Sequence, residues 1–142
     1  MGDLTRENLG FLLAKASQRW NELLRERFAA ARFPEVRPAF GSVLVPLFEE
    51  DGLRMGDLAR RSRLAKQTMT TLVRMTERAG LVRREADPED GRAARVFLTA
   101  HAQAFRPVAE RAVAELEENL ARLLSPTGAE TLRASLKDVI DL

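Results

Sequence analysis

Apolar side chains recur at steps of three and four residues along most of the chain, the spacing of helices that bury one face. At the amino-terminal end this spacing predicts one long helix over residues 5–32, with Thr5 as its N-cap. Towards the other end it predicts a helix over residues 100–124, after which Ser125 and Pro126 begin a last helix that runs to residue 142. A small domain cannot cover the apolar side of so long a leading helix, so we expect that side to meet a second chain.

The middle of the chain predicts shorter helices. Residues 38–50 predict a helix in which Pro46 lacks a backbone donor, so the helix should kink or shorten there. Residues 56–62 predict another short helix, and Pro107 should bend the long helix that begins at residue 100.

Residues 65–80 predict the amphipathic helix around which the rest of the chain is organised. Its apolar stripe consists of Met69, Leu72, Val73 and Thr76, and Gly80 can close it in a left-handed cap. A helix of this length fits a DNA major groove, where Gln, Thr, Lys and Arg side chains read base edges and contact phosphates. Such side chains occupy the opposite side: Lys66, Gln67, Thr70, Thr71, Arg74 and Arg78.

Two short strands follow this helix. Residues 81–86 and 94–99 predict a hairpin around the turn-rich sequence DPEDGR, and residues 54–55 predict a short strand that pairs with it. A helix followed by a hairpin with a basic tip is the plan of a winged helix-turn-helix. The predicted fold is therefore mostly α with a small β-hairpin wing, in a single domain over residues 1–142. Its dimerisation helices are residues 1–34 and 100–142, and its DNA-binding region is residues 35–99.

Charge is distributed unevenly along the chain. The formal net charge is only +2, but residues 54–95 contain eleven Lys or Arg against six Asp or Glu, a local charge of +5. The remainder therefore carries −3. Basic charge concentrated on the predicted reading unit is the electrostatic signature of a surface that binds phosphates, although a solvated charged face has the same composition.

Composition argues against an enzyme, a metal site or a bound cofactor. The chain has no cysteine, no tyrosine and one histidine, His101, which we interpret as structural. No glycine-rich phosphate loop is present. No apolar run approaches the ~18 residues of a membrane span, and residues 1–5 resemble neither a signal peptide nor a transit peptide. The expected compartment is the cytoplasm.

The sequence DPEDGRAARVFLT at residues 87–99 resembles the wing signature of the MarR family of bacterial transcriptional regulators. Residues 56–59, 69–73 and 80–82 resemble the two turn-motif helices of that family. This resemblance implies a homodimeric repressor that binds a near-palindromic operator and is released by a small lipophilic or aromatic effector. Where many relatives have Ser, Thr or Asp, this chain has Ala65, so the reading helix lacks a side-chain N-cap worth ~1 kcal/mol.

We expect the polar side of the reading helix to contact DNA, with Gln67, Thr71 and Arg74 nearest the base edges. Nearer the phosphates we place Lys66, Thr70 and Arg78, and Thr68 shares the same side. The alternative is an ordinary solvated helix face. Three threonines within four positions favour DNA contact, because threonine is a poor helix former.

Arg92 lies at the predicted wing tip, and we expect Asp90 to hold it so that its guanidinium enters a minor groove. The simpler interpretation, a surface turn pair worth ~0–1 kcal/mol, is compatible with this role. Arg83, Arg84 and Arg95 should flank it as phosphate contacts.

Trp20 falls on the apolar stripe of the first helix, where a large aromatic side chain favours a core or dimer-interface position. The alternative is an effector pocket between the dimer helices and the reading domain, lined by Trp20, Phe40, Leu44 and Phe105. A rival function is a winged-helix module that binds another protein without reading DNA. Salt dependence discriminates the two, because only phosphate contacts make affinity fall steeply with salt.

Overall fold

The computed structural model describes residues 4–142, so the first three residues of the predicted amino-terminal dimerisation segment lie outside the described chain. The predicted fold class is confirmed: residues 4–142 are mostly helical, with a small antiparallel sheet in the order β1-β3-β2. Among these residues, no helix combines the length and apolarity that a membrane crossing requires. The elements are α1 (Leu9–Ala30), the 3-10 helix η1 (Pro38–Phe40), α2 (Gly41–Glu49), β1 (Leu53–Arg54), α3 (Met55–Arg61), α4 (Lys66–Arg78), β2 (Val82–Ala86), β3 (Ala94–Leu98) and α5 (Ala100–Ile140).

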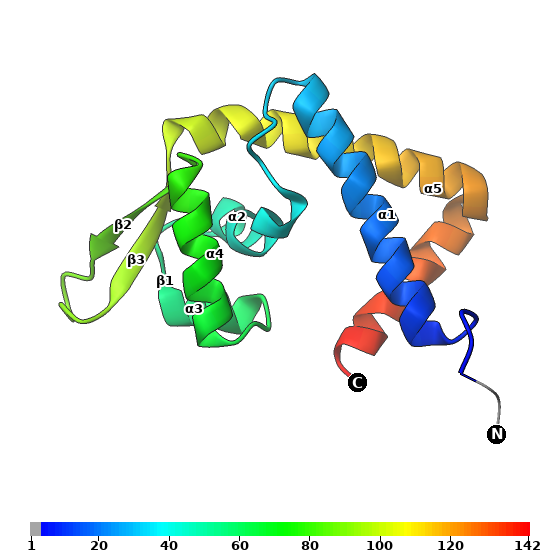
Figure 1. The fold of residues 1–142 in the computed structure, drawn as a ribbon, viewed down its shortest axis with the longest axis horizontal. Coiled ribbons are helices and arrows are strands. Elements are labelled where there is room, and N and C mark those ends of the chain that lie inside the picture. The colour runs from blue at the N-terminus through cyan, green and yellow to red at the C-terminus, as the bar shows by residue number, and fades with distance from the viewer. Residues whose placement is uncertain (1–3) are drawn as a thin grey trace.

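The chain divides into a head, residues 38–98, and two helical arms, α1 and α5 (Figure 1). The head packs α2, α3 and α4 against the sheet, and the hairpin of β2 and β3 projects from it as the wing. α1 crosses α5, and the last part of α5 turns back beneath that crossing (Figure 1). The carboxyl-terminal end thereby comes to lie on the side of the head away from the wing.

The start of α1 differs from the prediction. The helix begins at Leu9, and its N-cap is Asn8, whose Oδ1 accepts a hydrogen bond from the Phe11 N–H at 2.9 Å. Thr5, the predicted cap, instead accepts from the Glu7 N–H in a turn before the helix. The prediction of Thr5 was wrong because Asn8 is an equally good cap in sequence and lies one turn closer to the helix.

Pro46 neither ends nor shortens α2. The predicted helix over residues 38–50 is divided instead between η1 and α2, and Pro46 lies buried within α2. Its missing N–H leaves the Ser42 carbonyl without a donor from within the helix. The Ser62 hydroxyl, at the C-cap of α3, donates to that carbonyl at 2.6 Å and so joins α3 to α2.

α4 and the wing form where the sequence predicts them. α4 buries Met69, Val73 and Thr76, and Gly80 follows it with φ +78°, the left-handed conformation that closes a helix. β1 lies one residue earlier than predicted because Met55 already belongs to α3.

α5 is one element with a break. Thr99 caps its start by accepting from the Ala102 N–H at 3.2 Å. The backbone of α5 remains helical at Pro107, where we expected a bend, and leaves helical values at Ser125, with φ 70° and ψ 158°. The Ser125 hydroxyl accepts from the Gly128 N–H, which confirms Ser125 as the cap of the last segment.

The end of α5 reaches back to the head. Arg63, in the turn between α3 and α4, donates from Nη1 to the Ile140 carbonyl at 2.9 Å, and its Nη2 lies 3.2 Å from Asp141 Oδ1. An arm and the turn before α4 are therefore in direct contact.

Candidate nucleic-acid interface

The polar side of α4 is exposed along its length, because the helix packs into the core through the opposite stripe. The predicted residues on this side are brought together as one face: Lys66, Gln67, Thr68, Thr71, Arg74 and Arg78 are exposed, and Thr70 is half-buried. Within residues 4–142, Lys66, Arg74 and Arg78 have no ion-pair partner. Ala65 precedes the helix without a side-chain cap, as the sequence indicates.

Two of the three threonine hydroxyls on this face, those of Thr70 and Thr71, are engaged within the helix. Thr70 Oγ1 donates to the Lys66 carbonyl at 2.9 Å, and Thr71 Oγ1 donates to the Gln67 carbonyl at 3.1 Å. Their oxygen lone pairs remain available as acceptors. The side chains of Gln67 and Arg74 are exposed on the same face and carry N–H donors.

The arginines of β2 are paired with neighbouring carboxylates. Arg83 pairs with Glu85 and lies over the Phe97 ring, with its guanidinium carbon 4.7 Å from the ring centroid. Arg84 pairs with Glu77 at 3.1 Å. Both pairs are well exposed, and such pairs contribute only ~0–1 kcal/mol, so a phosphate can replace either carboxylate at low cost.

Asp90 shapes the wing tip through the backbone. Its Oδ1 accepts from the backbone N–H of Arg92 at 3.0 Å, and its carbonyl accepts from the Ala93 N–H. The Arg92 side chain is exposed and has no ion pair among the described residues. The structure thus places Asp90 beside Arg92 as expected, but in contact with its backbone and not with its guanidinium.

Arg95, which we expected beside the phosphates, turns inward towards a buried carboxylate. Its Nε lies 3.6 Å from Asp87 Oδ1, and Arg54 Nε lies 2.5 Å from Asp87 Oδ2. The Asp87 side chain is completely buried and also accepts from the Glu89 N–H at 3.0 Å. That hydrogen bond, together with the two guanidiniums, holds the pKa of Asp87 below its usual value despite burial, which acts in the opposite direction.

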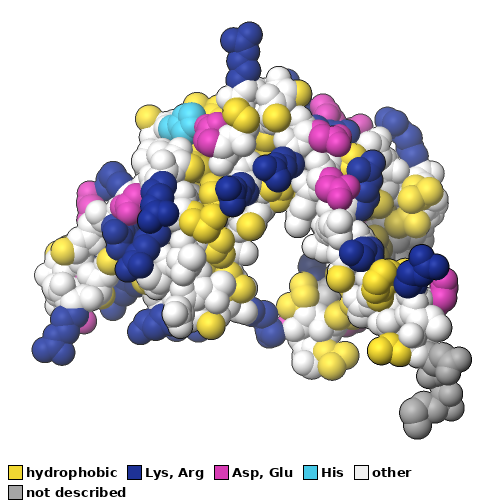
Figure 2. All heavy atoms as spheres, viewed as in Figure 1, with side chains coloured by type: hydrophobic (Ala, Val, Ile, Leu, Met, Phe, Trp, Pro, Cys, Tyr) yellow, Lys and Arg dark blue, Asp and Glu magenta, His cyan; other side chains and the backbone are white. Residues whose placement is uncertain are grey.

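Sequence reasoning missed Arg54 and the role of Asp87. No local signal in the sequence indicates either role, because Arg54 and Asp87 meet only through the pairing of β1 with β3. On the surface of the head, Lys and Arg side chains are concentrated on the part that carries β2, β3 and α4 (Figure 2).

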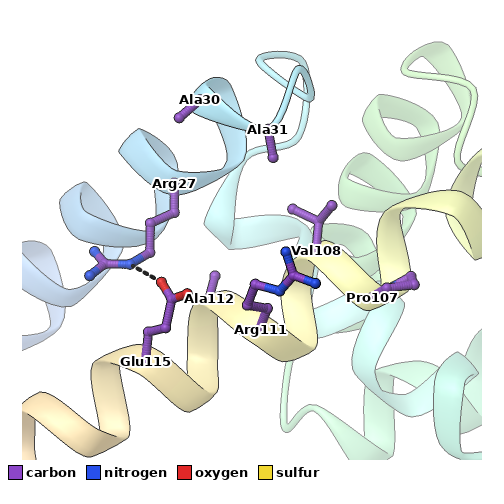
Figure 3. A pocket seen from close by; sticks show the side chains of 8 residues that line it. All are labelled: Arg27, Ala30, Ala31, Pro107, Val108, Arg111, Ala112 and Glu115. Carbon is purple, nitrogen blue, oxygen red and sulfur yellow. Dashed lines mark hydrogen bonds and ion pairs between the residues drawn. The ribbon is translucent and has the colours of Figure 1, made fainter.

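The four predicted effector residues do not line the hollow that lies between the arms. Phe40, Leu44 and Phe105 belong to the core, and Phe105 packs edge-on against Phe28 with centroids 4.8 Å apart. Trp20 is half-buried on α1. A separate hollow of about 330 Å³ lies where α1 crosses α5 (Figure 3). It is lined by Arg27, Ala30, Ala31, Pro107, Val108, Arg111, Ala112 and Glu115.

His101 connects α5 to the loop after α1. Its Nε2 lies 2.7 Å from Glu35 Oε1, and its ring packs on Phe33. A backbone hydrogen bond and the hydrogen bond with His101 keep the pKa of Glu35 below its usual value. Within residues 4–142 no three His, Asp or Glu side chains are grouped as a metal site needs.

Comparison with known proteins gives concordant matches. Residues 39–94 match the profile that describes the MarR family. The chain is 34% identical over 128 residues to an HTH-type transcriptional repressor of Mycobacterium tuberculosis. The aligned region covers 88% of this chain and 88% of that repressor.

Solved structures share the fold, among them those of two transcriptional regulators. The transcriptional repressor CouR, bound to a 23-mer DNA duplex, superposes with a TM-score of 0.80 at 26% identity, over 98% of this chain and 99% of CouR. A probable transcriptional regulator from Pseudomonas aeruginosa superposes with a TM-score of 0.80 at 28% identity, over 94% of this chain and 97% of that one.

Proposed function

This chain belongs to the MarR family of DNA-binding transcriptional regulators, and from that premise we propose that it is a homodimeric repressor of a near-palindromic operator. The family is one of regulators and not of enzymes. One observation carries the proposal: the cations on the polar face of α4 and Arg92 at the wing tip belong to the same head, and none of them has an ion-pair partner among residues 4–142.

The apolar surface of the arms supports the homodimer. Leu9 is 78% exposed on α1, and Leu123 and Ile140 are 78% and 58% exposed on α5. A groove of about 610 Å³ runs between the two segments of α5, with Leu132 and Leu136 among its lining residues. Large apolar side chains exposed together along two helices mark an interface. A second copy of α1 and α5 offers a matching apolar surface.

Two-fold symmetry then defines the DNA complex. The two α4 helices would enter successive major grooves, with centres ~34–36 Å apart. Gln67, Thr71 and Arg74 would lie at the base edges, with Lys66, Thr68, Thr70 and Arg78 towards the phosphates. Arg92 would enter the flanking minor groove, where narrow A·T-rich DNA concentrates negative potential. Arg83 and Arg84 would exchange their carboxylates for phosphates, while Arg95 supports the wing from below. A regulator of this kind acts on the chromosome, so we place it in the cytoplasm.

A small effector would act through the arms. The hollow at the crossing of α1 and α5 has apolar walls, and Arg27 and Arg111 at its rim favour an anionic aromatic or lipophilic molecule (Figure 3). Arg27 pairs with Glu115 at 3.3 Å, whereas Arg111 has no ion pair among the described residues. A ligand that also reached Trp20, Phe40, Leu44 and Phe105 would have to open the core. An effector can shift the spacing of the heads only by its differential affinity for the two spacings. The hydrogen bond from Arg63 to the Ile140 carbonyl joins the end of α5 to the turn before α4, so a movement of the arms would reach α4 through this contact.

Selection of bound sequences from random duplex DNA tests this function directly. We expect a near-palindrome whose half-sites are centred about 10–10.5 base pairs, or a multiple, apart. The alternative is a winged-helix module that binds a protein. Weak binding to duplex DNA that does not change with salt concentration would favour that alternative, because several phosphate contacts impose a steep dependence.

A further inference from the structure

A cleft lies between the wing and the amino-terminal ends of α3 and α4. It has a volume of about 500 Å³, and we call it the wing cleft. Its charged lining residues come from three parts of the head: Arg54, Asp57 and Arg60 around α3, Lys66 at the start of α4, and Asp90 and Arg92 in the wing. The cleft therefore joins the face of α4 to the tip of the wing.

The positive charge of the wing cleft is only partly compensated. Arg60 pairs with Asp57, and one carboxylate oxygen of Asp90 accepts from the wing backbone. Lys66 and Arg92 have no ion-pair partner within residues 4–142. Among the described residues the cleft thus presents two cations without a carboxylate partner, which favours an anionic occupant between α4 and the wing.

Arg54 contacts two carboxylates of different kinds. Its Nε lies 2.5 Å from Asp87 Oδ2, and the Asp87 side chain is completely buried, so this contact is part of the wing's structure. Its Nη2 donates to Glu89 Oε2 at 3.3 Å, and the Glu89 side chain is 80% exposed. A guanidinium has five N–H donors in a planar fork, so Arg54 can keep Asp87 while it exchanges Glu89 for another anion.

We propose that the wing cleft binds one phosphodiester group of the operator strand and that Arg54 exchanges Glu89 for that phosphate. This inference rests on the proposed function, because a strand that passes from the groove read by α4 to the groove entered by Arg92 crosses this cleft. Glu89 then acts as an internal competitor that lowers affinity for every duplex to the same degree. The exchange costs little, because exposed ion pairs are weak.

Glu89→Gln tests the competition. It removes the replaceable carboxylate and leaves the Arg54–Asp87 contact in place, so we expect each head to bind duplex DNA about two- to fivefold more tightly, with unchanged sequence preference. Fluorescence anisotropy with operator and random duplexes measures this. Glu85→Gln is the matched control, since Glu85 is also a wing carboxylate but pairs with Arg83.

Dependence on Arg54 separates the two carboxylates. In an Arg54→Gln background the gain from Glu89→Gln should vanish, whereas the gain from Glu85→Gln should persist. Equal gains from Glu89→Gln with and without Arg54 would overturn the exchange. Failure of the wild-type protein to bind any duplex would instead overturn the proposed function itself, and this inference with it.

Synthetic operators with one neutral methylphosphonate at a time locate the phosphate. We expect one position per half-site where neutralisation weakens wild-type binding about tenfold and weakens Lys66→Ala binding much less. Arg84→Ala, outside the wing cleft, should keep the full loss at that position. If Lys66→Ala and Arg84→Ala respond alike at every position, the cleft holds no phosphate and the inference is wrong.

Discussion

The head and the arms differ in how far they bury their large apolar side chains. In the head, Val43, Leu58, Met69, Val73 and Val96 are completely buried within one chain. In the arms, large apolar side chains remain exposed: Leu9, Leu12, Leu13, Leu123, Leu124, Leu132, Leu136, Val139 and Ile140. One core includes the head and, from the arms, buried residues such as Phe28 and Phe105, whereas the outer surface of the arms remains apolar and exposed. The comparison supports the proposed roles, DNA contact for the head and subunit contact for the arms, and each role can be tested with its own variant.

The largest effect should come from a charge placed on the arms. Leu136 lines the groove between the two segments of α5, so Leu136→Asp would bury an unpaired carboxylate in the proposed dimer interface. We expect a monomer in light scattering and a loss of operator affinity of at least ~3 kcal/mol. Gln103→Glu, at an exposed position on α5, should remain dimeric. A Leu136→Asp protein that stays dimeric would remove this groove from the interface.

The head should respond to a change in its core with a loss of stability and no change of dimer affinity. Leu58→Ala removes a completely buried side chain, and we expect the free energy of unfolding in urea to fall by ~2–5 kcal/mol. Val45→Ala is the control, because Val45 is 56% exposed on α2 and its truncation should cost far less. Dissociation of the Leu58→Ala dimer at temperatures where the protein is still folded would show that dimerisation depends on the core of the head.

Within the head, Arg74→Ala tests the exposed face of α4. The loss of a base contact should weaken operator binding by ~1–3 kcal/mol and relax the preference at one base pair in each half-site. Binding to a set of single-substitution operators measures both effects. Arg19→Ala on α1, an exposed arginine of the arms, should leave them unchanged. Unchanged operator affinity in Arg74→Ala would exclude Arg74 from the interface.

Arg92→Ala tests the wing tip, with a smaller expected loss of ~1 kcal/mol per head. Because a narrow minor groove concentrates negative potential, the loss should fall mainly on operators with A·T-rich flanks. Competition between A·T-flanked and G·C-flanked operators measures the difference. Equal losses on both flanks would indicate a simple phosphate contact.

The smallest effect concerns acid stability of the wing. The pKa of Asp87 is lowered in the folded state, so its contribution to stability is complete above the ordinary carboxyl pKa of ~4 and is lost as pH falls through the lowered value. Asp87→Asn should be less stable than the wild type at pH 7, and this difference should shrink in acid. Urea unfolding at pH 7 and at about pH 3 measures it. The lowered pKa of Glu35 acts in the same direction in both proteins and therefore cancels. A difference that does not change with pH would show that Asp87 acts through packing alone.

The sequence predicted what local patterns determine. The stripe of α4, the turn at Gly80 and the break at Ser125 each depend on a few neighbouring residues, and each lies where the sequence predicts it. The choice of Asn8 over Thr5 could not be made, because both residues cap helices well.

The arrangement beneath the wing could not be predicted, because it is a tertiary contact. Arg54 and Asp87 meet through the pairing of β1 with β3, and nothing in the local sequence of either residue indicates burial. The same holds for Arg95: its spacing in the wing is that of an exposed cation, and a buried carboxylate turns it inward.

The hydrogen bond from Ser62 to the Ser42 carbonyl has a consequence for how variants of this chain should be interpreted. With alanine at position 46, the backbone would supply that carbonyl's donor from its own helix, and the serine would be superfluous. Positions 46 and 62 are therefore expected to vary together. Proline at position 46 removes the donor for the Ser42 carbonyl, and the hydroxyl at position 62 replaces it. A homologue that has changed one of them is expected to have changed both.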